Sequence, residues 1–96
     1  MPTYIMLSKL TDKGSETVKG NPERIKTVAR EMESFGVRVI GQYAVLGPYD
    51  FVTIIEAPDN TTVSRVSMEI GARGSVKIET LPAIPIDDFI EWWIRP

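Results

Sequence analysis

Four segments of the chain are rich in apolar and β-branched residues and are bounded by turn signals, which predicts four strands. They span Thr3 to Leu10, Val37 to Leu46, Phe51 to Ala57 and Ser75 to Leu81. In the first and third segments both alternating sets of side chains are apolar, as in central strands covered on two faces. The last segment alternates apolar with charged residues, which is typical of an edge strand.

Between the first two strands, apolar residues recur at helical spacing from Ile25 to Phe35. The sequence Asn21-Pro22-Glu23 supplies an N-cap, a proline at the first helical position and an acid in the first turn. Gly36 is suited to the left-handed conformation that ends a helix. The preceding interval, Thr11 to Gly20, is long for a connection, and we interpret it as a short surface helical turn, with a mobile lid as the alternative.

A second helix is predicted to begin at Pro58-Asp59-Asn60-Thr61 and to be closed by Gly71 and Gly74. It places Val63, Val66 and Ile70 on one face at spacings of three and four residues. The predicted order is therefore strand, helix, strand, strand, helix, strand.

This order predicts a single α+β domain over residues 1–96 with the ferredoxin-like βαββαβ arrangement, in which a four-stranded antiparallel sheet carries two helices on one face. Its core comprises residues 3–82. The apolar second face needs a cover, and a second copy of the sheet would supply one, which predicts a dimeric α+β barrel and an even-numbered homo-oligomer. The alternative is that residues 83–96 fold back over part of that face.

Composition removes several kinds of chemistry. The 96 residues include no cysteine and no histidine, so disulfides, thiolate zinc sites and imidazole catalysis are excluded, and we expect no cofactor. Thirteen acidic and eleven basic residues give a net charge of −2 with both signs interspersed, which argues against nucleic acid as a partner. The first residues carry neither a signal-peptide pattern nor an apolar span, so we expect a cytoplasmic protein.

The carboxyl-terminal tail combines large apolar residues with acids. Phe89, Trp92 and Trp93 are predicted to anchor the tail on a neighbouring subunit, because buried aromatic side chains dominate interface energetics. The accompanying charges are mostly acidic, which disfavours a membrane surface. Asp87, Asp88 and Glu91, the acids of this tail, have the ligand type of a hard-cation site, but they also fit the polar face of a final helical turn, and we predict no metal.

Polar residues on the barrel face are candidates for ligand binding. With Tyr4, Met6 and Ser8 facing away from the helices, alternation would add five polar residues from the other strands. These are Arg38, Gln42, Thr53, Lys77 and Glu79. A shift of one residue in register would move each of them to the helix side, and charges on edge strands also serve simply to discourage aggregation.

Glu56 and Glu79 are the candidate general bases, since a carboxyl in an apolar barrel has a raised pKa. Tyr4, Tyr43 or Arg38 would orient the substrate. The alternative for a strand-end glutamate such as Glu56 is an ion pair with Arg65 or Arg73, two arginines of the second helix region.

Three sequence stretches carry a family resemblance: Tyr4-Ile5-Met6-Leu7, Leu46-Gly47-Pro48-Tyr49-Asp50-Phe51-Val52, and Ile78-Glu79-Thr80-Leu81-Pro82-Ala83. With Gly47, Tyr49 and Asp50 in the central stretch, the chain resembles GYD-domain proteins from Pro2 to about Phe89, although a proline stands between the glycine and the tyrosine. The resemblance implies a ferredoxin-like dimeric barrel without an established activity. The wider fold group is similar to effector-binding domains of leucine-responsive regulators and to small cofactor-free monooxygenases and isomerases.

The hairpin turn has two interpretations. Gly47 can adopt positive φ, Pro48 presets the turn, and Asp50 can accept backbone hydrogen bonds, so a purely structural turn is the simpler one. In the functional interpretation, Tyr49 and Asp50 line a ligand pocket between subunits, as the corresponding turn does in effector-binding regulators.

The sequence thus favours a non-catalytic homo-oligomeric module that binds a small metabolite at the subunit interface. The alternative is a small cofactor-independent enzyme, of the monooxygenase or isomerase kind, that uses the barrel interior as an apolar reaction chamber. A third possibility is a structural assembly protein with a well-packed interior.

Overall fold

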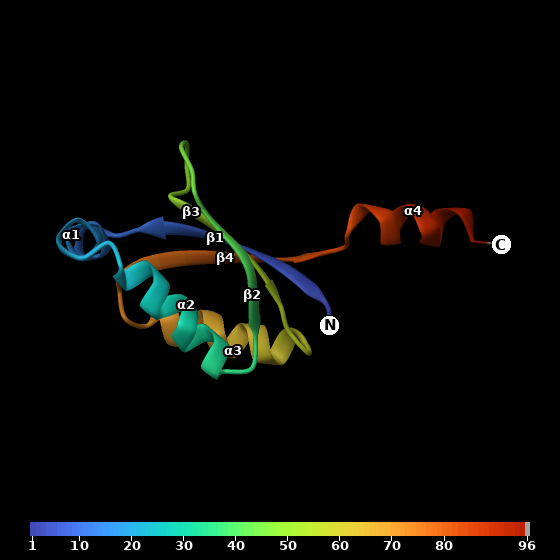
Figure 1. The fold of residues 1–96 in the computed structure, drawn as a ribbon, viewed down its shortest axis with the longest axis horizontal. Helices are drawn as coiled ribbons and strands as arrows, with labels where there is room; N and C mark the ends of the chain where they lie inside the picture. The colour runs from blue at the N-terminus through green and yellow to red at the C-terminus, as the bar shows by residue number, and fades with distance from the viewer. Residues whose placement is uncertain (96) are drawn as a thin grey trace.

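The computed structural model describes residues 1–95 and contains the predicted strands and helices together with two further helices. The elements are β1 (Thr3–Leu10), α1 (Asp12–Gly20), α2 (Arg24–Ser34), β2 (Arg38–Ala44), β3 (Phe51–Glu56), α3 (Asn60–Gly71), β4 (Val76–Ala83) and α4 (Ile86–Ile94). All neighbouring strands pair antiparallel in the order β2-β3-β1-β4. Figure 1 shows α2 and α3 together on one side of this sheet, which confirms the predicted ferredoxin-like α+β class.

The interval between β1 and α2 forms the nine-residue helix α1, so the surface-helix interpretation is confirmed. The Thr11 hydroxyl accepts a hydrogen bond from the Gly14 backbone N–H and caps the helix. The Thr11 backbone N–H donates to the Ser75 carbonyl at 3.0 Å. A Cβ at Gly14 would lie 2.0 Å from that same carbonyl oxygen, so only glycine permits this approach. These contacts hold α1 against the chain entering β4.

The predicted start of α2 is wrong by two residues. Asn21 does not cap α2; its backbone N–H donates to the Thr17 carbonyl and closes α1. Because the two helices are so close in sequence, residues 21–23 form a turn in which the Arg24 N–H donates to the Asn21 carbonyl at 3.1 Å. The predicted end is confirmed, since Gly36 follows α2 with φ of 98°.

The core lies between the sheet and helices α2 and α3. Its buried residues are Tyr4, Met6, Met32, Val37, Ile55, Ala57, Val63, Val66 and Ile70. The prediction that Tyr4 and Met6 face away from the helices is therefore wrong, because these side chains are only 3% and 2% exposed. The Tyr4 hydroxyl donates to the Asn60 Oδ1 at 2.6 Å, and Asn60 is the first residue of α3 on the helix side of the sheet.

Strand β2 contains an irregularity that changes the faces of its residues. Arg38 pairs with Glu56 and Val39 with Ile55, but Gly41 is the residue opposite Ile54. The extra residue, Ile40, is a β-bulge.

Beyond this bulge the alternation of faces is shifted by one. Gln42, paired with Thr53, lies on the helix side, whereas Arg38 lies with Glu56 on the opposite face. The predicted grouping of Arg38 with Gln42 is therefore wrong.

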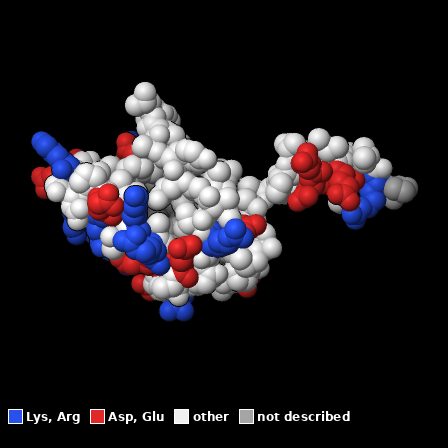
Figure 2. Space-filling model, viewed as in Figure 1, with Lys and Arg blue, Asp and Glu red and all other residues white. Residues whose placement is uncertain are grey.

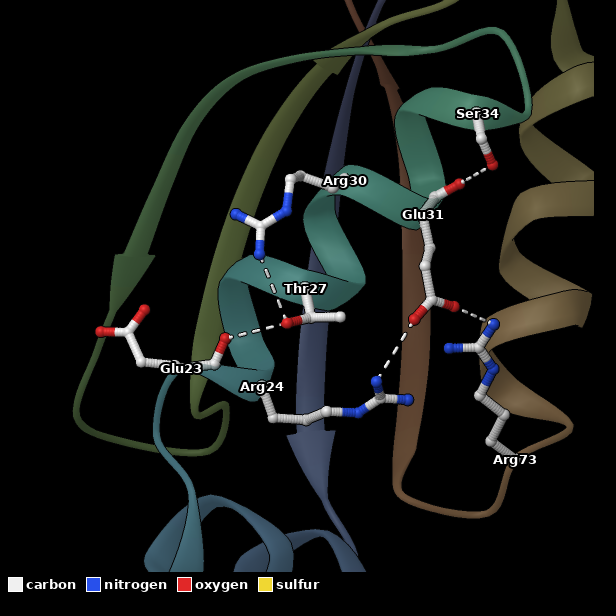
Figure 3. A network of polar contacts seen from close by, with 7 residues as sticks. All are labelled: Glu23, Arg24, Thr27, Arg30, Glu31, Ser34 and Arg73. Atoms are coloured by element: carbon white, nitrogen blue, oxygen red, sulfur yellow. Dashed lines mark hydrogen bonds and ion pairs between the residues drawn. The ribbon is translucent and has the colours of Figure 1, made fainter.

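An ion-pair network ties α2 to the end of α3 (Figure 3). Glu31 accepts from Arg24 at 3.3 Å and also pairs with Arg73. The hydrogen bond and charge of the Arg73 guanidinium, together with Arg24, hold the pKa of Glu31 below its ordinary value of 4.5, against a smaller opposing effect of partial burial. The two helices are thus joined by charge as well as by apolar packing.

We predict that Glu31→Gln lowers the melting temperature at pH 7 and that the difference from the parent narrows under acid. The pKa of Glu31 is lower in the folded state, so its stabilising contribution is complete above the unfolded value near 4.5 and disappears as pH falls through the folded value. Melting temperatures measured from pH 7 to pH 3 check this. Glu69→Gln, an exposed change on α3, is the control. A difference that stays constant down to pH 3 would contradict the prediction.

Candidate functional site

The sheet face opposite the helices is apolar at its centre. Register places Ile5 beside Ile54 and Leu81, and Leu7 beside Val52, all on this face. None of these side chains is buried, and no helix of residues 1–95 lies over them (Figure 1). We call these five residues and their surroundings the open sheet face. Contiguous exposed apolar surface is a common property of interaction sites.

An ion pair lies at the β2 edge of the open sheet face. Arg38 Nη1 is 3.4 Å from Glu56 Oε1, and the two residues are direct cross-strand partners. The predicted pairing of Glu56 with Arg65 or Arg73 is wrong. Arg73 binds Glu31 instead, and the Arg65 guanidinium lies 5.7 Å from the centre of the Phe35 ring.

At the β4 side of the open sheet face, Tyr49 reaches from the hairpin to Glu79. Its hydroxyl donates to the Glu79 Oε2 at 2.9 Å. This hydrogen bond to a carboxylate, with smaller contributions from partial burial and from the negative charge, raises the pKa of Tyr49 above its ordinary value of 10.0. Both candidate bases, Glu56 and Glu79, therefore lie on the open sheet face, and each already has a partner.

Asp50 joins the hairpin turn to the central strand. Its Oδ2 accepts the Leu10 backbone N–H at 2.8 Å, and its own backbone N–H donates to the Ser8 carbonyl at 2.8 Å. The Asp50 carbonyl accepts from Val45 at 2.9 Å, and Gly47 has φ of 106° as predicted. All of these contacts are structural.

The predicted ligand residues are divided between the two faces of the sheet and the turn. Tyr4, Met6, Gln42 and Thr53 are on the helix side, and Thr53 is only 4% exposed. Of these four, all but Tyr4 line a cavity of about 110 Å³ between the sheet and the helices. The predicted single site on the barrel face is therefore wrong. Alternation could not assign the faces correctly, because β1 is apolar on both sides and the bulge in β2 shifts its alternation by one residue.

The tail forms helix α4, which projects from the end of β4 and lengthens the molecule to 54 Å (Figure 1). No residue of α4 is buried, and Trp92 and Trp93 are each 65% exposed. Trp93 packs edge-on against Trp92 at 5.6 Å and Phe89 at 6.0 Å between ring centres. The interpretation in which the tail folds back over its own sheet is therefore wrong.

Acidic side chains stand out on the α4 lobe in Figure 2, whereas both signs are mixed over the main body on this view. Asp87 and Asp88 lie in the first turn of α4, and Glu91 is 3.8 Å from Arg95. Within residues 1–95, no three acidic side chains gather as a candidate metal site. No helix in the same range is long and apolar enough to cross a membrane.

Sequence reasoning missed the cluster of Arg24, Glu31 and Arg73. Arg24 and Glu31 are seven residues apart, a spacing that places them on one side of a helix and could have indicated a pair. Arg73 carries no such signal, because its approach depends on how α3 packs beside α2.

Comparison with known proteins identifies the family. The sequence model of the GYD domain matches residues 4–92. The chain belongs to the GYD-domain family. A relative from Thermus thermophilus is 60% identical over 91 residues, which cover 94% of this chain and 96% of the relative. That protein is named glutamine synthetase and cystathionine beta-lyase binding protein.

Two solved structures share the fold of this GYD-domain chain. The crystal structure of a Thermus thermophilus protein has a TM-score of 0.58 and 23% identity, covering 88% of this chain and 95% of its own. The crystal structure of FFRP-DM1 has a TM-score of 0.58 and 19% identity, covering 88% of this chain and all of its own. At these identities the likeness concerns the fold alone.

We predict that Asp50→Ala destabilises the protein by about 1–3 kcal/mol, because it leaves the part-buried Leu10 N–H without its acceptor. Asp50→Asn keeps a side-chain oxygen and should recover part of the loss. Urea denaturation measures both. Leu46→Ala, a change at the fully exposed tip of the same hairpin, should stay within about 0.5 kcal/mol of the parent. Equal stability of Asp50→Ala and the parent would remove the structural role of Asp50.

Proposed function

We propose that this GYD-domain protein is a non-catalytic homo-oligomeric binding module whose assembled form docks on metabolic enzymes. The observation that carries the proposal is the extent of uncovered apolar surface, on the open sheet face and on α4. Both candidate bases are engaged, Glu56 by Arg38 and Glu79 by Tyr49, which favours binding over catalysis.

The open sheet face fits a second copy of itself. An antiparallel sheet with a solvated face normally carries polar residues there, whereas Ile5, Leu7 and Ile54 are central on this one. Two such faces related by a two-fold axis bring apolar centre against apolar centre at the usual spacing of about 10 Å. The result is the dimeric barrel.

Helix α4 is suited to pack against the neighbouring copy. Its apolar stripe includes Phe89 and Trp93, and aromatic side chains of this kind are the usual energetic centres of interfaces. The acids of α4 find opposite charge at one end of the sheet of another copy, outside the apolar centre of the open sheet face, where Lys9 and Lys77 are cross-strand partners. A neighbouring copy thus offers apolar surface for the aromatic side of α4 and lysines for its acidic side.

The edges of the open sheet face provide polar groups for a small metabolite between subunits. Arg38 and Glu56 lie at one edge, and Tyr49 and Glu79 lie at the other. In the dimer these groups approach the partner copy, and a ligand bound there would bias the assembly. This interface site replaces the one that alternation along the strands suggested.

The enzyme partners follow from the relative. The Thermus thermophilus protein named for binding glutamine synthetase and cystathionine beta-lyase is 60% identical over 91 residues, which cover 94% of this chain. The match to the family model extends into α4 as far as Trp92. From this identity over almost the whole chain, we propose that this chain binds the same two enzymes of its own host.

We predict an even-numbered oligomer that depends on the open sheet face. Leu7→Glu places a charge at the centre of the proposed interface and should raise the dissociation constant at least 100-fold, since a buried unpaired charge is strongly unfavourable. Native mass spectrometry and sedimentation at micromolar concentration measure the change. Circular dichroism checks that the variant folds, and Ile54→Lys offers a second change on the same face.

The double change Trp92→Ser with Trp93→Ser should weaken assembly at least tenfold. Met68→Ser, which removes an exposed apolar residue of α3 outside both surfaces, should leave the mass unchanged. A monomeric parent, or an unchanged oligomer in Leu7→Glu and Ile54→Lys, would overturn the dimeric barrel.

We also predict saturable binding of the parent oligomer to the host's glutamine synthetase and cystathionine β-lyase. Surface plasmon resonance with each purified enzyme measures it, and the monomeric Leu7→Glu variant should bind at least tenfold more weakly. Binding to neither enzyme would refute the partner assignment. Equal binding by the monomer would mean that assembly is not needed.

A further inference from the structure

A cavity of about 110 Å³ lies on the opposite side of the sheet from the proposed interface, beneath α1 and α2. Most of its wall is apolar. The apolar side chains that line it include Met6, Val28, Met32, Phe51, Ile70 and Ile78. An engineered apolar cavity of about 150 Å³ binds benzene, so this space suits an apolar group of about that size or slightly smaller.

The cavity persists because the sheet beneath it is lined by small and polar side chains. Ser8 and Thr53 occupy the inward positions of the two central strands, and Gln42 extends the row on β2. Above them, α1 is held at its first turn, where the Thr11 backbone N–H donates to the Ser75 carbonyl and Gly14 lies close to it. Polar groups on the floor and apolar groups on the walls make an amphiphilic chamber.

Arg73 supplies the chamber with a cation that has spare hydrogen-bonding capacity. Its Nη2 pairs with Glu31, but its Nη1 is buried and has no hydrogen-bond partner among residues 1–95. A buried charged donor without a partner is costly, which makes such a group rare unless something binds it. Arg73 belongs to the cavity wall, and Figure 3 shows its guanidinium between α2 and the end of α3.

The charges around Arg73 leave an excess of one positive charge. Arg24 also lines the cavity, and it shares the single carboxylate of Glu31 with Arg73. Two guanidinium groups therefore face one anion. A guanidinium fork matches a carboxylate in geometry, and a single additional negative charge would balance the cluster.

We propose that this cavity binds a small organic carboxylate with an aromatic or branched apolar body of about six carbons. The carboxylate pairs with the guanidinium of Arg73, whose buried Nη1 turns toward the cavity to donate to it, and the apolar body lies among Val28, Met32 and Phe51. The hydroxyls of Ser8 and Thr53 offer further polar contacts. This site is on the helix side of each subunit and is independent of the dimer interface and of the enzyme partners.

Isothermal titration calorimetry with the 96-residue protein tests the proposal, with benzoate and 4-methylpentanoate as probes and benzamide and 4-methylpentanamide as their neutral counterparts. We expect one molecule per chain, and at least tenfold tighter binding of an acid than of its amide. Arg73→Gln should reduce the affinity for the acid at least tenfold, to that for the amide. Arg30→Gln, an exposed arginine of α2 that contacts Thr27, is the matched control and should change affinity less than twofold.

If Arg73→Gln does not fold, the variant Val28→Phe still tests whether the probes bind in the cavity. Val28→Phe fills the chamber and leaves Arg73 in place, so it should abolish binding of acid and amide alike while retaining the oligomeric mass of the parent. The proposal would be overturned if acid and amide bound with equal affinity or if neither acid bound. It would also be overturned if Val28→Phe bound the probes as the parent does, or if inorganic phosphate bound in preference to benzoate. None of these outcomes bears on enzyme binding, which is measured separately.

Discussion

The structure depends on one constraint, which is that the two central strands are apolar on both faces while the chain's own helices cover only one. Tyr4, Met6 and Ile55 are buried under α3, and the opposite side chains of the same strands remain half-exposed. Apolar area left in water is unfavourable in proportion to its extent, and this cost is the physical basis of the proposed homo-oligomer.

Local polar contacts hold this sheet in one register. Asp50 ties the hairpin turn to β1 through two hydrogen bonds of 2.8 Å, and the bulge at Ile40 sets which residues of β2 face the helices. A slip of one residue would break the Asp50 contacts and exchange the two faces. The same register that buries the core therefore also fixes the apolar centre of the open sheet face, with its charged pairs at the edges.

The two faces of the sheet serve different kinds of recognition in our account. The open sheet face and α4 offer broad apolar area, which suits protein partners. The helix side offers a small, partly open cavity beside a guanidinium nitrogen of Arg73 that has no hydrogen-bond partner within residues 1–95, which suits a small anion.

The sequence by itself determined the strands, the two main helices, the antiparallel ferredoxin-like order and the family. These follow from local periodicity, caps and turn residues such as Asp59, Gly36 and Gly47, which act within a few positions of themselves. Only the tertiary structure decided which face each strand residue occupies, since β1 is apolar on both sides and a bulge interrupts β2. It also decided that Arg73 meets Glu31 and that α4 stands clear of the sheet, because such contacts depend on packing between segments far apart in sequence, which no local pattern encodes.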